Sequence, residues 1–261
     1  MAAASLRLGG TWGDKLELLR LFACHGGLLS FGNGVELKSI GTRFEGAPRL
    51  HYRDTGPDGI LVTELLVEED YKALRALQLQ PKVILDIGAN IGLGSFFMKS
   101  LYPAARVIGF EPSRAEGEVL ARNYAAWSAC EWLPVAVGDQ DGVNLRFAVH
   151  PDKTGGQHLA TEDEADGWNY VTVPVRRIDA LVDEGRFPLP DLVKIDVEGA
   201  EVAVLTGFGR YVDAPAAYIM ETHSPVLHGQ CLTLLQDKGY RVAADSPRGA
   251  GARILCMIKT A

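Results

Sequence analysis

Residues 83–97, VILDIGANIGLGSFF, decide the fold, because they join an apolar run to a glycine-containing turn and then to a helical pattern. Such an apolar run is typical of a strand buried on both faces of a parallel sheet. Gly88 permits a tight bend, and Gly92 lets a helix that begins near Ile91 start close to the strand. The first amides of that helix can bind an electron-rich ligand, and Asp86 can order the loop by accepting from its amides. The turn is therefore a candidate ligand site, although an ordinary strand-to-helix loop has the same pattern.

Further strands and helices surround this segment. Apolar runs alternate with helical patterns after residue 83, which predicts right-handed crossovers and an α/β fold with a mostly parallel sheet covered by helices on both faces. The last two runs flank a turn rich in proline and glycine and should pair antiparallel. The runs are VILDIG, ARVIGFE, WLPVAVG, DLVKIDV, AYIMET, GYRVAAD and ARILCMIK.

Residues 1–80 differ in pattern and are expected to form a helical and β cap beside a main domain of residues 81–261. WGDKLELLRLFACH predicts a short amphipathic helix with Leu16, Leu19 and Phe22 on one face, and a double glycine follows as a stop signal. Strand fragments come next, GVELKSIG and RLHYRD, and a helix is expected around EEDYKALRAL.

Composition excludes several classes of protein. The 261 residues have a formal net charge of −7 and a hydrophobic content of 47%, enough for one large core but without a global field that would collect nucleic acid. The four cysteines are widely spaced, which fits reduced thiols in a cytosol-like compartment. No run approaches the ~18 apolar residues of a membrane span, and the start lacks a signal-peptide pattern. We therefore expect a soluble, cytoplasmic protein with no membrane or nucleic-acid partner.

The next predicted strand, RVIGFE, ends in Glu111, 25 residues beyond Asp86. A carboxylate at a neighbouring strand tip can accept hydrogen bonds from both ribose hydroxyls of an adenosine, and Pro112 offers an apolar face to the adenine. On its own, Glu111 would equally suit a cap for the next helix. Together, the glycine turn and Glu111 predict a ligand that contains adenosine.

NAD and S-adenosylmethionine both contain such an adenosine. A dinucleotide fingerprint places a glycine where the pyrophosphate comes closest, and this chain has Asn90 there. The chain also lacks the Tyr-x-x-x-Lys pair that short-chain dehydrogenases use. The turn therefore favours a ligand without phosphate, and an NAD-type oxidoreductase stays as an alternative.

The run DLVKIDVEGAEVAVL places charges where a central parallel strand should be apolar. Lys194 and Asp196 point to one side of the strand, and Glu198 and Glu201 follow at the start of the next helix. Buried charges are costly unless they are paired or functional. Lys194 could simply neutralise Asp196, but the position across from the glycine turn favours a role in the site.

The strings ILDIGANIG, VIGFEPS, AVGDQDG and DLVKIDVEGAEVAVLTG, in this order and spacing, resemble the FkbM family of S-adenosylmethionine-dependent methyltransferases over roughly residues 60–225. The resemblance implies a Rossmann-like class I methyltransferase fold, with a seven-stranded sheet in the order 3-2-1-4-5-7-6. It also implies O-methylation of a sugar or natural-product hydroxyl, with an amide or amine nitrogen as the alternative target. Pro134 departs from the polar residue that many relatives have before AVGD.

The resemblance further implies roles for individual residues around S-adenosylmethionine. Asp86, Gly88 and Asn90 would line its methionine part, while Glu111 would bind the ribose and Pro112 the adenine. The remaining expected neighbours are Ala136 and Val137 at the adenine edge, Asp196 near the methyl group, Glu64 and Tyr71 at the amino-acid end, and Gly92 beneath the turn.

An alcohol acceptor must lose its proton, so a general base is needed near the methyl group. The candidates are Asp196 and, from YIMETHSP at the next strand tip, Glu221 and His223, an imidazole whose unperturbed pKa lies near neutrality. The same side chains and Glu198 could hold magnesium. Strand-end carboxylates also serve as cofactor and helix-cap ligands, so we predict no metal ligand.

The small-molecule acceptor itself leaves no readable pattern. Its pocket should be built from residues 1–80, 150–168 and 222–231, loops that vary without a code. Two subunits could pair through strands near RLHYRD to give a homodimer, and a binding module without turnover is the alternative from another class. Aromatic or histidine side chains that could face the acceptor are Trp12, Tyr52, His150, His158, Trp168 and Tyr170.

Overall fold

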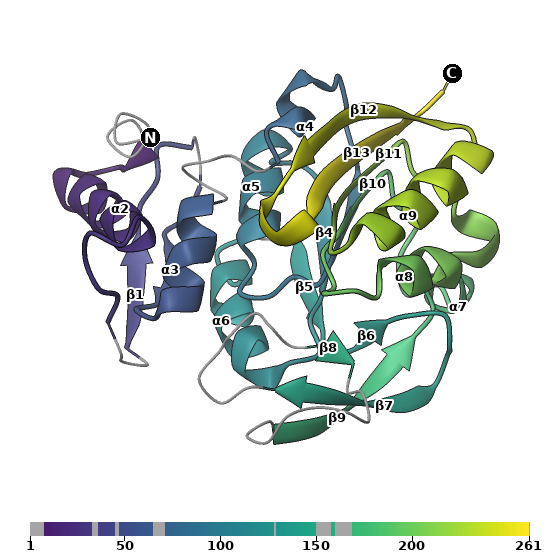
Figure 1. Cartoon of the computed structure of the whole chain (residues 1–261), viewed down its shortest axis with the longest axis horizontal. Helices are drawn as coiled ribbons and strands as arrows, with labels where there is room; N and C mark the ends of the chain where they lie inside the picture. Colours follow the sequence, from purple (N-terminus) through teal and green to yellow (C-terminus); the bar gives the residue numbers. More distant parts are fainter. Residues whose placement is uncertain are drawn as a thin grey trace.

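A seven-stranded sheet forms the centre of the molecule (Figure 1). The computed structural model describes residues 8–32, 36–44, 47–64, 71–127, 129–149, 158–159 and 169–260. The strands in spatial order are β5 (Cys130–Leu133), β4 (Arg106–Phe110), β3 (Val83–Ile87), β10 (Leu192–Ile195), β11 (Ala217–Thr222), β13 (Arg253–Lys259) and β12 (Tyr240–Pro247).

The pairing of these strands confirms the predicted topology. Numbered along the chain within this sheet, the order from β5 is 3-2-1-4-5-7-6. β3 pairs in parallel with β4 and β10, and β4–β5 and β10–β11 continue the parallel ladder. β13 is antiparallel to both β11 and β12, as expected for the last two runs. The parallel strands therefore bring their carboxyl ends to one edge of the sheet.

Helices cover both faces of the sheet because its central strands are apolar on both sides. Alternate positions of β3 show this, since Ile84 packs with Phe97 and Leu120 on one face, whereas Leu85 packs with Leu205 on the other. The helices of the first face are α4 (Ala73–Ala76), α5 (Leu93–Leu101) and α6 (Arg114–Tyr124). Those of the second face are α7 (Ile178–Asp183), α8 (Glu201–Gly207) and α9 (Pro225–Asp237), with short 3-10 turns at Gly209–Tyr211 and Gly249–Gly251.

The N-terminal elements lie beside α6, at the left of Figure 1. They are α2 (Trp12–His25), β1 (Leu37–Ile40), β2 (Leu50–Arg53) and α3 (Gly56–Val62). The amide of His51 donates to Asn123 of α6 at 2.7 Å, and Arg53 pairs with Glu116 at 3.4 Å. Tyr52 packs in the same hydrophobic cluster as Leu120. The division at residue 80 and a homodimer through these strands stay predictions.

The predicted helix near the start is confirmed, but its predicted buried face is wrong. Asp14 of the capping box also accepts from the amide of Gly41 at 2.9 Å and from Arg49, which turns the helix stripe of Leu18 and Leu21 inward. Leu16 is consequently 63% exposed. The second predicted helix is represented by the short α4, because residues 65–70 lie outside the described part of the chain.

WLPVAVG does not form the single strand that the sequence predicted. Pro134 separates β5 from β6 (Ala136–Val137), because proline lacks the N–H that a continuing ladder needs. β6 instead pairs with β9 (Asn169–Arg176), in a second sheet of order β6-β9-β7-β8 that contains β7 (Val143–Val149) and β8 (His158–Leu159). The chain thus leaves the main sheet after β5, forms this second sheet, and returns to the main sheet at β10.

Among the described residues, no helix has the length and apolar character that crossing a bilayer requires.

Candidate functional site

The turn after β3 brings the backbone of three segments into contact. Gly88 has a φ of 74°, and a Cβ there would collide with the carbonyl oxygen of Asp196, just beyond β10. Gly92 has a φ of 90° and caps α5, where a Cβ would lie 2.6 Å from Leu120. Both positions therefore require glycine, as predicted. The helix begins at Leu93, later than the expected start near Ile91.

Asp86 orders the turn in a different way from the one predicted. It is fully buried, accepts from the Ser95 hydroxyl at 2.6 Å, and pairs with Lys194 at 3.1 Å. Lys194 also donates to the carbonyl oxygen of Gly88 at 2.6 Å. Asp86 thus acts on the turn through Lys194 rather than by accepting from the loop amides. Lys194 lies farther from Asp196, at 3.7 Å, so it is mainly the partner of Asp86.

Glu111 follows β4 and is 6% exposed, so it is not the surface acid that a simple helix cap would be. Its carboxylate accepts from the amides of Asn90 at 2.9 Å and Ser113 at 2.8 Å, which ties the tips of β3 and β4 together. Burial raises the pKa of Glu111 to about 7, although these two amides act in the opposite direction. Burial therefore favours the protonated form of Glu111 more than in an exposed glutamate.

A cavity of about 310 Å³ opens beyond the carboxyl ends of β3, β4, β10 and β11. Two of the predicted cofactor neighbours, Asp86 and Gly92, do not line the cavity. Asp86 instead holds Ser95 and Lys194, and Gly92 caps α5. The predicted residues that do line the cavity are Glu64, Tyr71, Gly88, Asn90, Glu111, Pro112, Ala136, Val137 and Asp196, together with the predicted catalytic residue Glu221.

Part of the apolar wall of the cavity comes from a strand that the sequence did not assign to it. Leu61 of α3 falls within residues 1–80, which were expected to contribute to the acceptor pocket, whereas Leu145 and Phe147 belong to β7 of the second sheet and were not predicted. A short alternating apolar pattern in NLRFAV was their only signal, and it fits any exposed hairpin.

The predicted aromatic wall is not formed by the described residues. Trp12 is 73% exposed, Tyr52 is fully buried with its hydroxyl on Glu17, and Tyr170 packs beside Arg146 at the surface. None of the three lines the cavity. His150 and Trp168 lie outside the described residues, as does the side chain of His158.

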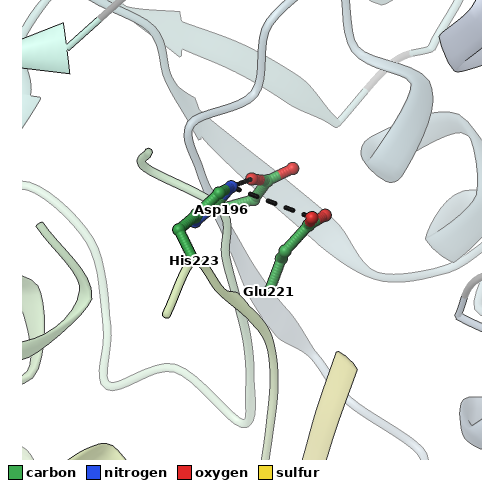
Figure 2. Close-up of side chains that lie close together, drawn as sticks. All are labelled: Asp196, Glu221 and His223. Carbon is green, nitrogen blue, oxygen red and sulfur yellow. Dashed lines mark ion pairs between the residues drawn. The ribbon is translucent and has the colours of Figure 1, made fainter. Parts of the chain in front are cut away.

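The three predicted catalytic side chains, Asp196, Glu221 and His223, lie close together at the tips of β10 and β11 (Figure 2), but only Asp196 and Glu221 line the cavity. The Nε2 atom of His223 lies 3.7 Å from Oδ1 of Asp196 and 3.8 Å from Oε1 of Glu221. Oε2 of Glu198 approaches the same nitrogen to 3.4 Å. The tips of β10 and β11 thus combine one imidazole with several carboxylates, as their sequence predicted.

The electrostatic surroundings of His223 differ from the expectation of a near-neutral imidazole. Burial alone would lower its pKa, but the hydrogen bond from Nδ1 to Glu201 at 2.6 Å and the charges of Asp196 and Glu198 raise the pKa to about 9. Burial and the charge of Asp196 raise the pKa of Glu221 to about 7. In the protein alone, His223 therefore carries a proton at neutral pH, and Glu221 is the group closer to its titration midpoint.

Arg248 is a cavity residue that the sequence did not reveal. It lies in the turn between β12 and β13, pairs with Glu64, and contacts Oε2 of Glu221 at 3.3 Å. Its partners are remote in the sequence, and an arginine in a glycine-rich turn carries no signal of such contacts. Arg248 joins the N-terminal region to the acidic end of the cavity.

Comparison with known proteins places the chain among methyltransferases. Residues 86–242 match the family model described as Methyltransferase FkbM domain, which is more than half of the chain. The chain is 32% identical over 195 residues to "Methyltransferase sdnD" of Sordaria araneosa, covering 62% of this chain and 74% of that protein.

Two further relatives have names that include their acceptor position. "31-O-demethyl-FK506 methyltransferase FkbM" of Streptomyces tacrolimicus is 27% identical over 234 residues, which cover 77% of this chain and 89% of the relative. "2-O-methyltransferase NoeI" of Sinorhizobium fredii is 26% identical over 193 residues, with coverage of 66% and 78%.

Proposed function

The chain belongs to the FkbM family of S-adenosylmethionine-dependent methyltransferases, and from this premise we propose that it methylates a hydroxyl oxygen of a small molecule. The observation that carries the proposal is the meeting of Asp196 and Glu221 at one end of a cavity whose other end holds Glu111. The names of the two relatives that specify O-methylation support oxygen as the target. Family membership favours methyl transfer over the alternatives of an NAD-type oxidoreductase and a module without turnover.

The cavity residues fit S-adenosylmethionine. A buried carboxylate, Glu111, suits the ribose hydroxyls, and Pro112 and Val137 offer apolar contacts to the adenine. Glu64 and Tyr71 would lie at the amino-acid end, beside Arg248, which pairs with Glu64 and Glu221. Several acidic side chains line the cavity, which suits a ligand with a positively charged sulfur. When bound, this cofactor supplies an electrophilic methyl group and departs as the neutral thioether.

The contribution of the chain is to hold the acceptor in line and to accept its proton. A hydroxyl at the acidic end would donate to Asp196 or Glu221, and the proton would pass to that carboxylate as the oxygen–carbon bond forms. The pKa of about 7 suits Glu221 for this step near neutral pH. Leu61, Leu145 and Phe147 would exclude water from the reacting atoms.

The test is a turnover assay with S-adenosylmethionine and a panel of sugar, natural-product hydroxyl and amide acceptors, with the methylated position assigned by NMR. We expect an O-methyl product, and we expect Asp196→Asn to slow transfer while S-adenosylhomocysteine still binds. A product methylated on nitrogen would contradict the proposed acceptor. Absence of S-adenosylhomocysteine binding by calorimetry would contradict the role given to the cavity.

A further inference from the structure

Asp196, Glu221 and His223 direct one atom each toward a common point, as Figure 2 shows. The three ligand atoms all lie within 4.8 Å of one another. The separations of Nε2 from the two carboxylate oxygens, 3.7 and 3.8 Å, are too long for hydrogen bonds. Two ligands that bind one ion at ~2.0–2.2 Å lie roughly 3–4 Å apart, so these separations suit a shared cation better than direct contact.

The other polar atom of each side chain faces a charged or hydrogen-bonding partner. Oδ2 of Asp196 faces Lys194 at 3.7 Å, and Oε2 of Glu221 faces Arg248 at 3.3 Å. Nδ1 of His223 bonds to Glu201 at 2.6 Å. Each side chain is thereby oriented with one atom left toward the common point, which is how outer partners orient the ligands of metal sites.

Glu201 provides a separate indication that His223 is positioned as a ligand. Its side chain is fully buried at the start of α8, and its second oxygen, Oε2, has no hydrogen-bond partner among the described residues. A carboxylate is costly to bury, and here Oε1 bonds to Nδ1 of His223 at 2.6 Å and also accepts from the amide of Gly199 at 2.9 Å. A carboxylate on one nitrogen of a histidine is the arrangement that orients histidine ligands, and the other nitrogen here, Nε2, faces the carboxylates of Asp196, Glu221 and Glu198.

We propose that Asp196, Glu221 and His223 bind a divalent cation that accepts mixed nitrogen and oxygen ligands, of the Mn²⁺ or Zn²⁺ kind. One imidazole with two carboxylates suits such ions better than Mg²⁺, which prefers oxygen alone. Three protein ligands leave coordination positions open toward the cavity that Asp196 and Glu221 line. The sequence offered these residues as possible metal ligands, but only the structure shows that their ligand atoms lie close together and that Lys194, Arg248 and Glu201 contact their other polar atoms.

The role of this cation rests on the proposed function. The hydroxyl oxygen of the acceptor would occupy an open position, which lowers the pKa of the hydroxyl. Its proton would leave to water, the oxygen would take the methyl group, and the sulfur–carbon bond would break to give the thioether. Asp196 and Glu221 would then act through the cation instead of accepting the proton themselves.

The test is a titration of the whole chain, freed of metal by a chelator, with Mn²⁺ followed by EPR and with Zn²⁺ followed by calorimetry. No cofactor or acceptor is present. We expect one site, and we expect Asp196→Asn, Glu221→Gln and His223→Gln each to weaken binding at least tenfold. Glu201→Gln should weaken it about tenfold, the usual effect of losing a partner behind a ligand.

His228→Gln is the matched control, because His228 also faces a carboxylate, Asp245 at 3.4 Å, but lies outside the cavity. It should bind the cation as the unaltered chain does, and thermal melts confirm that each variant folds. No saturable binding of either ion at millimolar concentration would overturn the proposal, as would binding that all three ligand variants retain. If S-adenosylhomocysteine binds in those samples, the proposed function survives that result.

Discussion

The two ends of the cavity are built in different ways. At the β3–β4 end, Glu111 is held by backbone amides of Asn90 and Ser113, which are close to it in the sequence or on the neighbouring strand. At the β10–β11 end, Asp196 and Glu221 face side-chain cations, Lys194 and Arg248. The first end can be encoded by a short motif, whereas the second depends on residues that only the complete fold brings together.

This difference has a chemical consequence. Backbone amides present a fixed geometry whatever the neighbouring side chains are, which suits a cofactor common to the whole family. Side-chain ion pairs can be rearranged by single substitutions, which suits a region that must accommodate different acceptors. We therefore expect substitutions at the first end to weaken cofactor binding strongly, and substitutions at the second end to change turnover.

The largest effect should come from Gly88→Ala, because Gly88 of the β3–β4 end contacts the backbone of Asp196 at the β10–β11 end. The new Cβ would collide with the carbonyl oxygen of Asp196 and would strain a backbone with a φ of 74°. We expect a loss of about 3 kcal/mol in unfolding free energy, measured by denaturant titration, and loss of S-adenosylhomocysteine binding. Gly185→Ala separates the two causes, because its φ is 72° and nothing lies within 4 Å. Equal destabilisation by both variants would show that the contact with Asp196 is unimportant.

Glu111→Ala should weaken S-adenosylhomocysteine binding about a hundredfold, as expected for the loss of charge-assisted hydrogen bonds in a buried site. Calorimetry measures this directly. Glu118→Ala, on the exposed face of α6, is the control and should bind normally. Unchanged affinity in Glu111→Ala would remove the β3–β4 end from the cofactor site.

The same carboxyl group predicts a pH dependence of binding. With a pKa of about 7, Glu111 is mainly ionised at pH 8 and mainly protonated at pH 6. The ionised form is the better acceptor for ribose hydroxyls, so affinity should fall about tenfold between pH 8 and pH 6. Glu111→Gln should bind weakly at both pH values, and an equally steep fall in that variant would assign the titration to another group.

The smallest of these effects is expected at the other end, from Arg248→Ala. Half-buried ion pairs contribute about 1 kcal/mol, so we expect turnover to fall about fivefold while the protein stays folded. Arg253→Ala provides the comparison, since Arg253 pairs with Asp245 on the same hairpin but does not line the cavity. If the two variants behaved alike, the contacts of Arg248 with Glu64 and Glu221 would have no special role.

The sequence predicted the β3–β4 end well because its signals are local. The turn geometry of Gly88 and Gly92 and the position of Glu111 at the next strand tip followed from spacing along one βαβ unit. The strand order followed from the family resemblance. The pairing of β12 with β13 followed from the turn rich in proline and glycine between them. These features depend on neighbours within about one supersecondary unit.

Other features could not be predicted because they depend on tertiary contacts. Arg248 reaches Glu64 only because β13 inserts between β11 and β12, and no local pattern encodes that. Pro134 sends β6 into a second sheet, which brings Phe147 to the cavity. The face of α2 that is buried was set by the bonds of Asp14 to Gly41 and Arg49, which outweighed its apolar periodicity.

The position of β13 also bears on how the enzyme matures during synthesis. β13 follows every other strand in the chain, yet it lies between β11 and β12. A nascent chain still held by the ribosome at residue 252 would therefore leave β11 with an open edge and could not dock the hairpin that delivers Arg248. The contacts of Arg248 with Glu64 and Glu221 can therefore form only after β13 has been synthesised and has paired with β11.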